Sequence, residues 1–156
     1  MWSMTLDPRF APEVVLPVLL RPGRGVYGLF IRDALIEEGF SDMPPSGGYV
    51  LGLLEHGRPL SEVIAEMGFS KQRASQLVDT MVIRGYVERR VDADDRRRMT
   101  LTLTERGRAA SEVVYHTVVE IDERLVAAVG AEYVAHTKET LAALVELRTD
   151  GEESLR

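Results

Sequence analysis

The chain has 156 residues, 45% of them hydrophobic, and a formal net charge of −6. This composition favours a folded core over disorder, and no apolar run is long enough to cross a bilayer. Cysteine is absent, which excludes disulfides, thiolate zinc sites and cysteine nucleophiles. With no signal-peptide pattern at the N-terminus, we expect a cytoplasmic protein, consisting of one domain or of one domain with a helical appendage.

The charge is distributed unevenly along the chain. Residues 56–108 contain eleven Lys and Arg against eight Asp and Glu, a balance of +3, whereas the remainder has a balance of −9. A mildly basic segment within an acidic chain indicates a polyanion-binding module carried on an acidic support.

The N-terminal third predicts helices separated by turns. Four prolines in residues 1–22 indicate an irregular arm with at most a short helix. Residues 24–38 have the apolar spacing of a helix. A second helix is expected over residues 45–57, although three internal glycines weaken it, and a short third helix over residues 60–67. Gly68 then forms a turn.

The next segment, SKQRASQLVDTMVIRG (residues 70–85), predicts a helix with two different faces. Ser70 is suited to cap its N-terminus, and Gly85 to end it. One apolar stripe consists of Ala74, Leu77, Val78 and Met81. The first turns and the other face carry Lys71, Gln72, Arg73, Ser75 and Gln76. Two short helices joined by a glycine turn, the second exposing amides and cations, are typical of a helix-turn-helix.

A hairpin is expected directly after this helix. Residues 86–91 form one strand, and residues 99–104 alternate Met or Leu with Thr, as a second strand would. The loop between them, DADDRRR, holds three acids followed by three arginines. A charged loop is more often simply solvated, but its position after a helix-turn-helix makes it the wing of a winged helix. Arginines at a wing tip suit phosphates and the narrow minor groove of DNA.

These segments resemble the MarR family of bacterial winged-helix regulators over residues 45–110. The resemblance is carried by SKQRASQLVDTMVIRGYVERR and by DADDRRRMTLTLTERG. The second stretch is similar to the family's wing signature, in which an Asp-x-Arg is followed by a Leu-Thr-x-x-Gly. The matching positions are Asp95, Arg97, Leu103, Thr104 and Gly107. The chain departs from the family at Gly48, where an aromatic residue is common.

The resemblance implies roles for individual residues. Arg97 would enter the minor groove with Asp95 holding it, while Arg96 and Arg98 would point towards phosphates or solvent. The residues expected in the major groove are Ser70, Lys71, Gln72, Arg73, Ser75 and Gln76. The resemblance also implies a pocket for a small aromatic or apolar effector, with four candidate residues, although aromatic residues at helical spacing are more often plain core: Tyr27, Phe30, Tyr49 and Tyr115.

The C-terminal third predicts two long helices, separated at Gly130. The first of them has more apolar surface than one small lobe covers, so we expect a homodimer, as the resemblance also implies. The alternative is a monomer whose long helix packs on its own N-terminal arm. The fold class is therefore mainly α (α+β), with a dimerisation arm and helix in residues 1–39, a winged-helix lobe in residues 40–106 and dimerisation helices in residues 107–156.

No pattern of an enzyme or a cofactor site is present. The three histidines lie far apart in sequence, and there is no catalytic triad, phosphate loop or paired-carboxylate motif. Glu112, His116 and Glu120 share one helix face and could chelate a metal, but such spacing is common by chance, so no metal site is expected.

The sequence thus predicts a homodimeric, sequence-specific DNA-binding transcription regulator, a repressor released by a small ligand. Its partner would be a pseudo-palindromic duplex, read in the cytoplasm on the nucleoid, with no role for a membrane. The alternative is a winged-helix protein-interaction module without DNA binding. The salt dependence of binding to duplex DNA separates the two.

Overall fold

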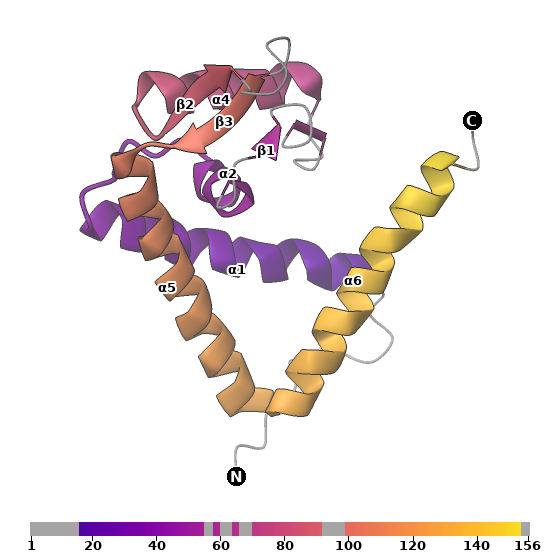
Figure 1. Ribbon diagram of the computed structural model, residues 1–156. Coiled ribbons are helices and arrows are strands. Elements are labelled where there is room, and N and C mark those ends of the chain that lie inside the picture. Colours follow the sequence, from indigo (N-terminus) through magenta and orange to yellow (C-terminus); the bar gives the residue numbers. More distant parts are fainter. Residues whose placement is uncertain (1–15, 55–57, 60–63, 66–69, 92–98, 154–156) are drawn as a thin grey trace. The chain divides into compact units, whose positions relative to one another are not determined.

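The computed structural model describes residues 16–54, 58–59, 64–65, 70–91 and 99–153 (Figure 1). The chain divides into two compact units, and the boundary lies within one long helix between Val118 and Val119. Each unit is described by itself. Among the described helices, none combines the length and apolar character that crossing a membrane requires.

Helix α1 (Leu16–Glu37) begins well before the expected residue 24. The prediction of an irregular arm was wrong for residues 16–22, while residues 1–15 lie outside the described part of the chain. Pro17 falls in the first turn, where N–H groups have no partner within the helix, so a proline is tolerated there. Pro22 lies inside α1. Its missing N–H removes one backbone hydrogen bond, but the helix continues through it to Glu37.

Helix α2 (Gly47–Leu53) is shorter than predicted and is fitted closely to its neighbours through glycine. A Cβ on Gly47 would lie 2.5 Å from Sδ of Met43, and one on Gly48 would lie 3.0 Å from Cγ2 of Ile31 on α1. Two of the three glycines that weakened the helix prediction therefore lie at close contacts, where a larger residue would require Met43 or Ile31 to shift. The helix ends at Leu53, not at residue 57.

Helix α4 (Lys71–Ile83) has the ends that the sequence predicted. The Ser70 hydroxyl accepts a hydrogen bond from the Arg73 N–H at 3.3 Å. Gly85, with φ +73°, closes the other end: its N–H donates to Val82 O, and the N–H of Tyr86 donates to Met81 O at 2.9 Å. The preceding predicted helix, residues 60–67, lies mostly outside the described residues.

The hairpin is formed by β2 (Val87–Val91) and β3 (Met99–Leu103), paired antiparallel from Val87↔Leu103 to Val91↔Met99. A third strand, β1 (Arg58–Pro59), pairs with the other edge of β3, giving the order β1-β3-β2. Strand β1 was not predicted, because two residues carry no alternation. The winged-helix architecture itself is confirmed, and Figure 1 shows its hairpin and α4 together.

Helix α5 (Glu105–Val129) starts before Gly107, which sequence analysis had placed at the domain boundary. The Thr104 hydroxyl accepts from the Gly107 N–H at 3.0 Å and donates to Gly85 O at 2.5 Å. A Cβ on Gly107 would lie 1.9 Å from the Tyr86 carbonyl oxygen. Gly107 thus marks a close contact in the first turn of α5, and Thr104 is the cap.

The core of the unit that ends at Val118 is drawn from α2, α4, the sheet and the start of α5. Its fully buried residues include Val50, Leu51, Ala74, Val78, Met81, Tyr86, Leu101 and Ala110. In the other unit, α5 continues to Gly130, whose φ of +95° separates it from α6 (Ala131–Glu153). The predicted break at Gly130 is confirmed.

Candidate functional site

The outer face of α4 presents the residues that the sequence assigned to the major groove. Ala74, Val78 and Met81 on the inner face are fully buried, which fixes the helix against the core. Five of the outer and first-turn residues are exposed: Ser70, Lys71, Gln72, Arg73 and Gln76. The sixth, Ser75, is half-buried. These six residues therefore lie together at one end of a rigid helix.

The N-terminus of α4 is electropositive. No acidic residue occurs in its first turn, while Lys71 and Arg73 both do. The unpaired N–H groups and the helix dipole add to the attraction for an anion there. This end of the helix suits a phosphate, and the neighbouring amide and guanidinium groups suit base edges.

The wing is anchored to α4 at its base. Arg89 of β2 forms an ion pair with Asp79 of α4, and Arg90 pairs with Glu88 on its own strand. The four predicted tip residues, Asp95, Arg96, Arg97 and Arg98, lie outside the described residues. Their roles stay predictions.

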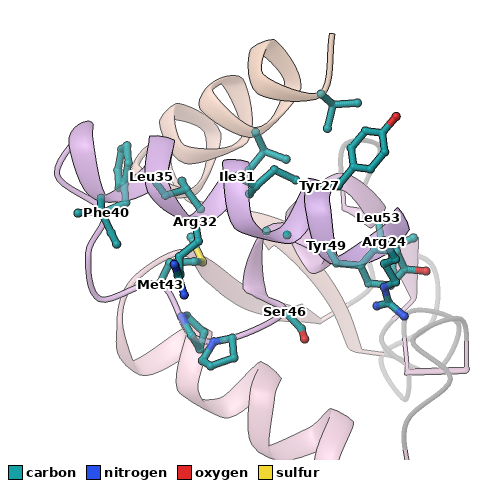
Figure 2. Close-up of a pocket in the computed structure, with 18 of the residues that line it drawn as sticks. Arg24, Tyr27, Ile31, Arg32, Leu35, Phe40, Met43, Ser46, Tyr49 and Leu53 are labelled. Atoms are coloured by element: carbon teal, nitrogen blue, oxygen red, sulfur yellow. The ribbon is translucent and has the colours of Figure 1, made fainter. Parts of the chain in front are cut away.

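A cavity of about 580 Å³ opens between α1, the turn over residues 40–46, α2 and the first half of α5 (Figure 2). Figure 2 shows Phe40 and Met43 towards one end and Arg24 and Tyr49 towards the other. Most of the wall is apolar, with Ile31, Leu35, Leu53, Val114 and Val118 among its residues. The volume is in the range of small-molecule sites.

The charged groups that line the cavity are both cations. Arg24 lies over the ring of Tyr49, 5.3 Å from its centroid, and Arg32 pairs with Asp33 at 3.1 Å. No Asp or Glu is among the lining residues. A cavity with apolar walls and arginine at its edge suits an apolar or aromatic anion.

Two glycines leave part of this cavity empty. Gly28 of α1 and Gly52 of α2 both line it, and a Cβ at either position would meet no atom within 4 Å. Packing does not require glycine at these positions, although each costs roughly 1 kcal/mol relative to alanine inside a helix. Because these two positions carry no side chain, the cavity is larger than it would be with any other residue there.

Two of the four aromatic residues predicted for the pocket line this cavity: Tyr27 and Tyr49. Phe30 and Tyr115 are not among its lining residues, and both are largely exposed. At Gly48, which also lines the cavity, a Cβ would lie 3.0 Å from Cγ2 of Ile31, so an aromatic residue there would require Ile31 to shift. Arg24, Arg32 and Met43 were not predicted for this site, because nothing local distinguishes them from surface residues.

A polar cluster beside the cavity was also missed. The Tyr86 hydroxyl donates to Oδ1 of Asp42 at 2.5 Å, and Arg106 donates to both oxygens of the same carboxylate, at 2.7 and 3.2 Å. The Arg106 guanidinium also lies over the Tyr86 ring, 4.4 Å from its centroid. These residues are separated by 44 and 20 positions in the chain, so no sequence pattern joins them.

The cluster shifts two ionisation equilibria. The hydrogen bond from Tyr86, together with Arg106, holds the pKa of Asp42 below its ordinary value. Burial and the hydrogen bond to Asp42 raise the pKa of Tyr86 to about 12. Both groups are therefore held in their ordinary charge states, a neutral phenol and a carboxylate, at neutral pH.

Within the described part of the chain, no three His, Asp or Glu side chains come together as a metal site. Glu112, His116 and Glu120 share a face of α5 without forming one. His116 instead packs its ring edge-on against Tyr115, with the centroids 5.6 Å apart.

Known structures share this fold. MepR of S. aureus in complex with DNA superposes with a TM-score of 0.68 at 21% identity, covering 86% of this chain and 98% of that one. CouR, a transcriptional repressor bound to a 23-mer duplex, gives 0.67 at 22% identity, covering 84% and 92%. The reduced form of MarR from E. coli gives 0.65 at 20% identity, covering 84% and 96%.

In sequence, no curated protein matches the chain. Residues 41–98 match the model of the MarR family, a segment that spans the turn beside the cavity, α4 and β2. The family match and the shared fold confirm the resemblance found in the sequence: residues 41–98 match the MarR family, and the chain has the winged-helix fold of these structures.

Proposed function

We propose that this protein is a homodimeric, sequence-specific DNA-binding transcription regulator, a repressor whose DNA affinity falls when a small apolar or aromatic acid fills the cavity. The observation that carries the proposal is the two-faced helix α4, with its core face fully buried and its cationic first turn exposed. A winged helix with this arrangement presents its second helix to the major groove. Such a regulator acts where the chromosome is, in the cytoplasm on the nucleoid.

Two similar structures support a DNA partner, since MepR and CouR are bound to duplexes in theirs. Gln72 and Arg73 are the residues that we assign to base reading, because amide to adenine and guanidinium to guanine are the geometrically favoured pairs. Lys71 and the first-turn N–H groups are assigned to phosphate.

Exposed apolar residues support the homodimer. On α6, large side chains that lie mostly in solvent include Tyr133, Leu144, Val145 and Leu147, and on α1 they include Val18, Val26 and Leu29. Large apolar side chains exposed in this number favour an interface with a partner over a surface that faces solvent. A twofold dimer requires a pseudo-palindromic site.

The test of DNA recognition is selection from a pool of random duplexes. We expect a pseudo-palindrome to be enriched and bound with a Kd of about 10⁻⁸ M. The logarithm of its binding constant should fall steeply with the logarithm of the salt concentration. If no sequence is enriched and binding to partners is insensitive to salt, the chain is a protein-interaction module.

Substitutions then separate base contacts from phosphate contacts. Gln72→Ala and Arg73→Ala should each reduce the free-energy preference for the selected duplex over a scrambled one by about 1–3 kcal/mol. Lys71→Ala, on the same turn, should weaken both duplexes alike. An unchanged preference in the first two variants would show that base reading lies elsewhere.

For the wing, we propose that Arg97 enters the minor groove and that Asp95 braces it, by the resemblance of the wing sequence. Arg97→Ala should reduce DNA affinity and lower the salt slope by about one unit per site. Asp95→Ala should also weaken binding, although simple electrostatics predicts the opposite. Tighter binding by Asp95→Ala at low salt would show that the acid is not a brace.

A further inference from the structure

Tyr86 joins the end of α4 to the wall of the cavity. Its N–H donates to Met81 O at 2.9 Å, so the residue is fixed to the last turn of α4. Its fully buried ring packs against the ring of Phe40, with centroids 6.2 Å apart, and its hydroxyl reaches Asp42. Phe40 lines the cavity, so Tyr86 contacts both a cavity wall and the helix end.

Asp42 lies in the turn that forms this wall. Ser41 and Met43, its neighbours in the chain, line the cavity, whereas Asp42 is bonded on the side of α4 and α5. Its carboxylate accepts from Tyr86 and Arg106, and its backbone carbonyl accepts from the Arg84 guanidinium. A displacement of the turn therefore alters contacts at the C-terminal end of α4 directly.

Arg106 closes the cluster from the first turn of α5. Besides its two bonds to Asp42, it donates to Arg84 O at 2.5 Å, at the C-cap of α4, and it stacks on the Tyr86 ring. The cavity turn, the end of α4, the start of β2 and the start of α5 meet in these contacts. The ion pair of Asp79 with Arg89, by contrast, joins α4 to the hairpin.

We propose that Asp42 and Tyr86 are positioning residues through which the cavity turn sets the placement of α4. A group that fills the cavity displaces the turn over residues 40–43, and the bonds of Asp42 and the ring of Phe40 transmit that displacement through Tyr86 to the helix. Packed cores respond to such displacement by switching between discrete arrangements. This inference rests on the proposed function and adds to it the connection between the effector site and the DNA-reading helix.

The experiment fills the cavity by mutation, because no ligand is identified. Gly28→Leu places a side chain on the cavity wall; Gly23→Leu, on the same helix and with equal open space, lies away from the wall and is the matched control. Each is made in the native chain, in Tyr86→Phe and in Arg89→Gln. Two quantities are measured: hydrogen exchange of the amides of residues 71–83 without DNA, and Kd for the selected duplex.

In the native chain, Gly28→Leu should change α4 exchange and shift the duplex Kd by about fivefold or more, the lower end of typical allosteric coupling. Gly23→Leu should do neither. In the Tyr86→Phe chain, both responses to Gly28→Leu should be lost, whereas Arg89→Gln should keep them. Asp42→Ala removes the acceptor but keeps the Tyr86 ring in the core, and it should act as Tyr86→Phe does. It replaces Tyr86→Phe in the experiment if that variant fails to fold.

An α4 that responds equally to Gly28→Leu with and without the Tyr86 hydroxyl would overturn the inference, and so would an α4 that never responds. The exchange measurement needs no DNA. If exchange responds through Tyr86 but no duplex is selected, the connection stands and the proposed DNA binding fails.

Discussion

Helices α4 and α6 differ in how completely the chain itself covers their apolar residues. In α4, Ala74, Val78 and Met81 are all 0% exposed, and both helix ends are capped. In α6, the described side chains, residues 131–147, include none that is buried, and Tyr133 is 71% exposed. The lobe that holds α4 is therefore stabilised by its own core, whereas the large apolar side chains of α6 stay exposed within the part of the chain that the structure describes.

The sharpest way to break the lobe is Gly107→Ala. A Cβ there would lie 1.9 Å from the Tyr86 carbonyl oxygen, which is backbone and cannot rotate away. We expect the free energy of unfolding to fall by about 3 kcal/mol or more, measured by urea denaturation. Gly52→Ala, where the added methyl meets open space, should instead stabilise by up to about 1 kcal/mol. Equal tolerance of the two changes would contradict the close contact at Gly107.

The exposed apolar residues of α6 predict that replacing them by alanine weakens the dimer. Tyr133 and Leu144 fall on one face of the helix, and replacing both by alanine should raise the dimer Kd by about 2 kcal/mol, or roughly thirtyfold. Sedimentation across a concentration series measures this. The matched control is Ile83→Ala: Ile83 is 84% exposed, the highest value among the large apolar residues that the structure describes in the lobe, and its replacement should not affect association. A native chain that sediments only at 17.4 kDa at micromolar concentration would contradict the dimer.

A smaller effect is expected at the N-cap of α4. Ser70→Ala removes the acceptor for the Arg73 N–H and should cost about 1 kcal/mol of stability. Ser70→Asp keeps the cap but places a negative charge at the proposed phosphate contact. It should therefore retain thermal stability while weakening duplex binding. If Ser70→Asp binds DNA as well as the native chain, this end of α4 does not face phosphate.

The smallest effect is a pH dependence from the Asp42 cluster. The pKa of Tyr86 is raised from 10.0 to about 12, so its stabilising contribution is complete below pH 10 and is lost as pH rises through about 12. The pKa of Asp42 is lowered, so its contribution is present above its ordinary value of 3.8 and is lost as pH falls further. Solvent screens the Asp42–Arg106 pair, whose side chains are 44% and 39% exposed.

Comparing unfolding free energies of the native chain and Tyr86→Phe across alkaline pH checks this. The difference between them should shrink above pH 10, and an absorbance titration should show a tyrosine that ionises near pH 12 only in the native chain. A difference that stays constant with pH would contradict the role of the hydroxyl.

The sequence predicted most of the lobe because its signals are local. Ser70, Gly85 and the stripe from Ala74 to Met81 act within one helix and its two ends, and the alternation in residues 99–103 acts within one strand. Two helix starts that differ from the prediction have a common cause. Pro17 and Gly107 were expected to precede α1 and α5, whereas a first turn accepts proline and a close contact requires glycine.

By itself, the sequence determined the order of α4, the hairpin and the two C-terminal helices, the caps of α4, the break at Gly130 and the polar outer face of α4, because each depends on neighbours a few residues away. Only the tertiary structure decided which aromatic residues line the cavity, why Gly48 carries no side chain, and that Asp42, Tyr86 and Arg106 meet. These depend on which surfaces come together across 20 to 70 residues of chain. Spacing along the sequence does not encode such contacts, because packing selects them from the shape and volume of whole elements.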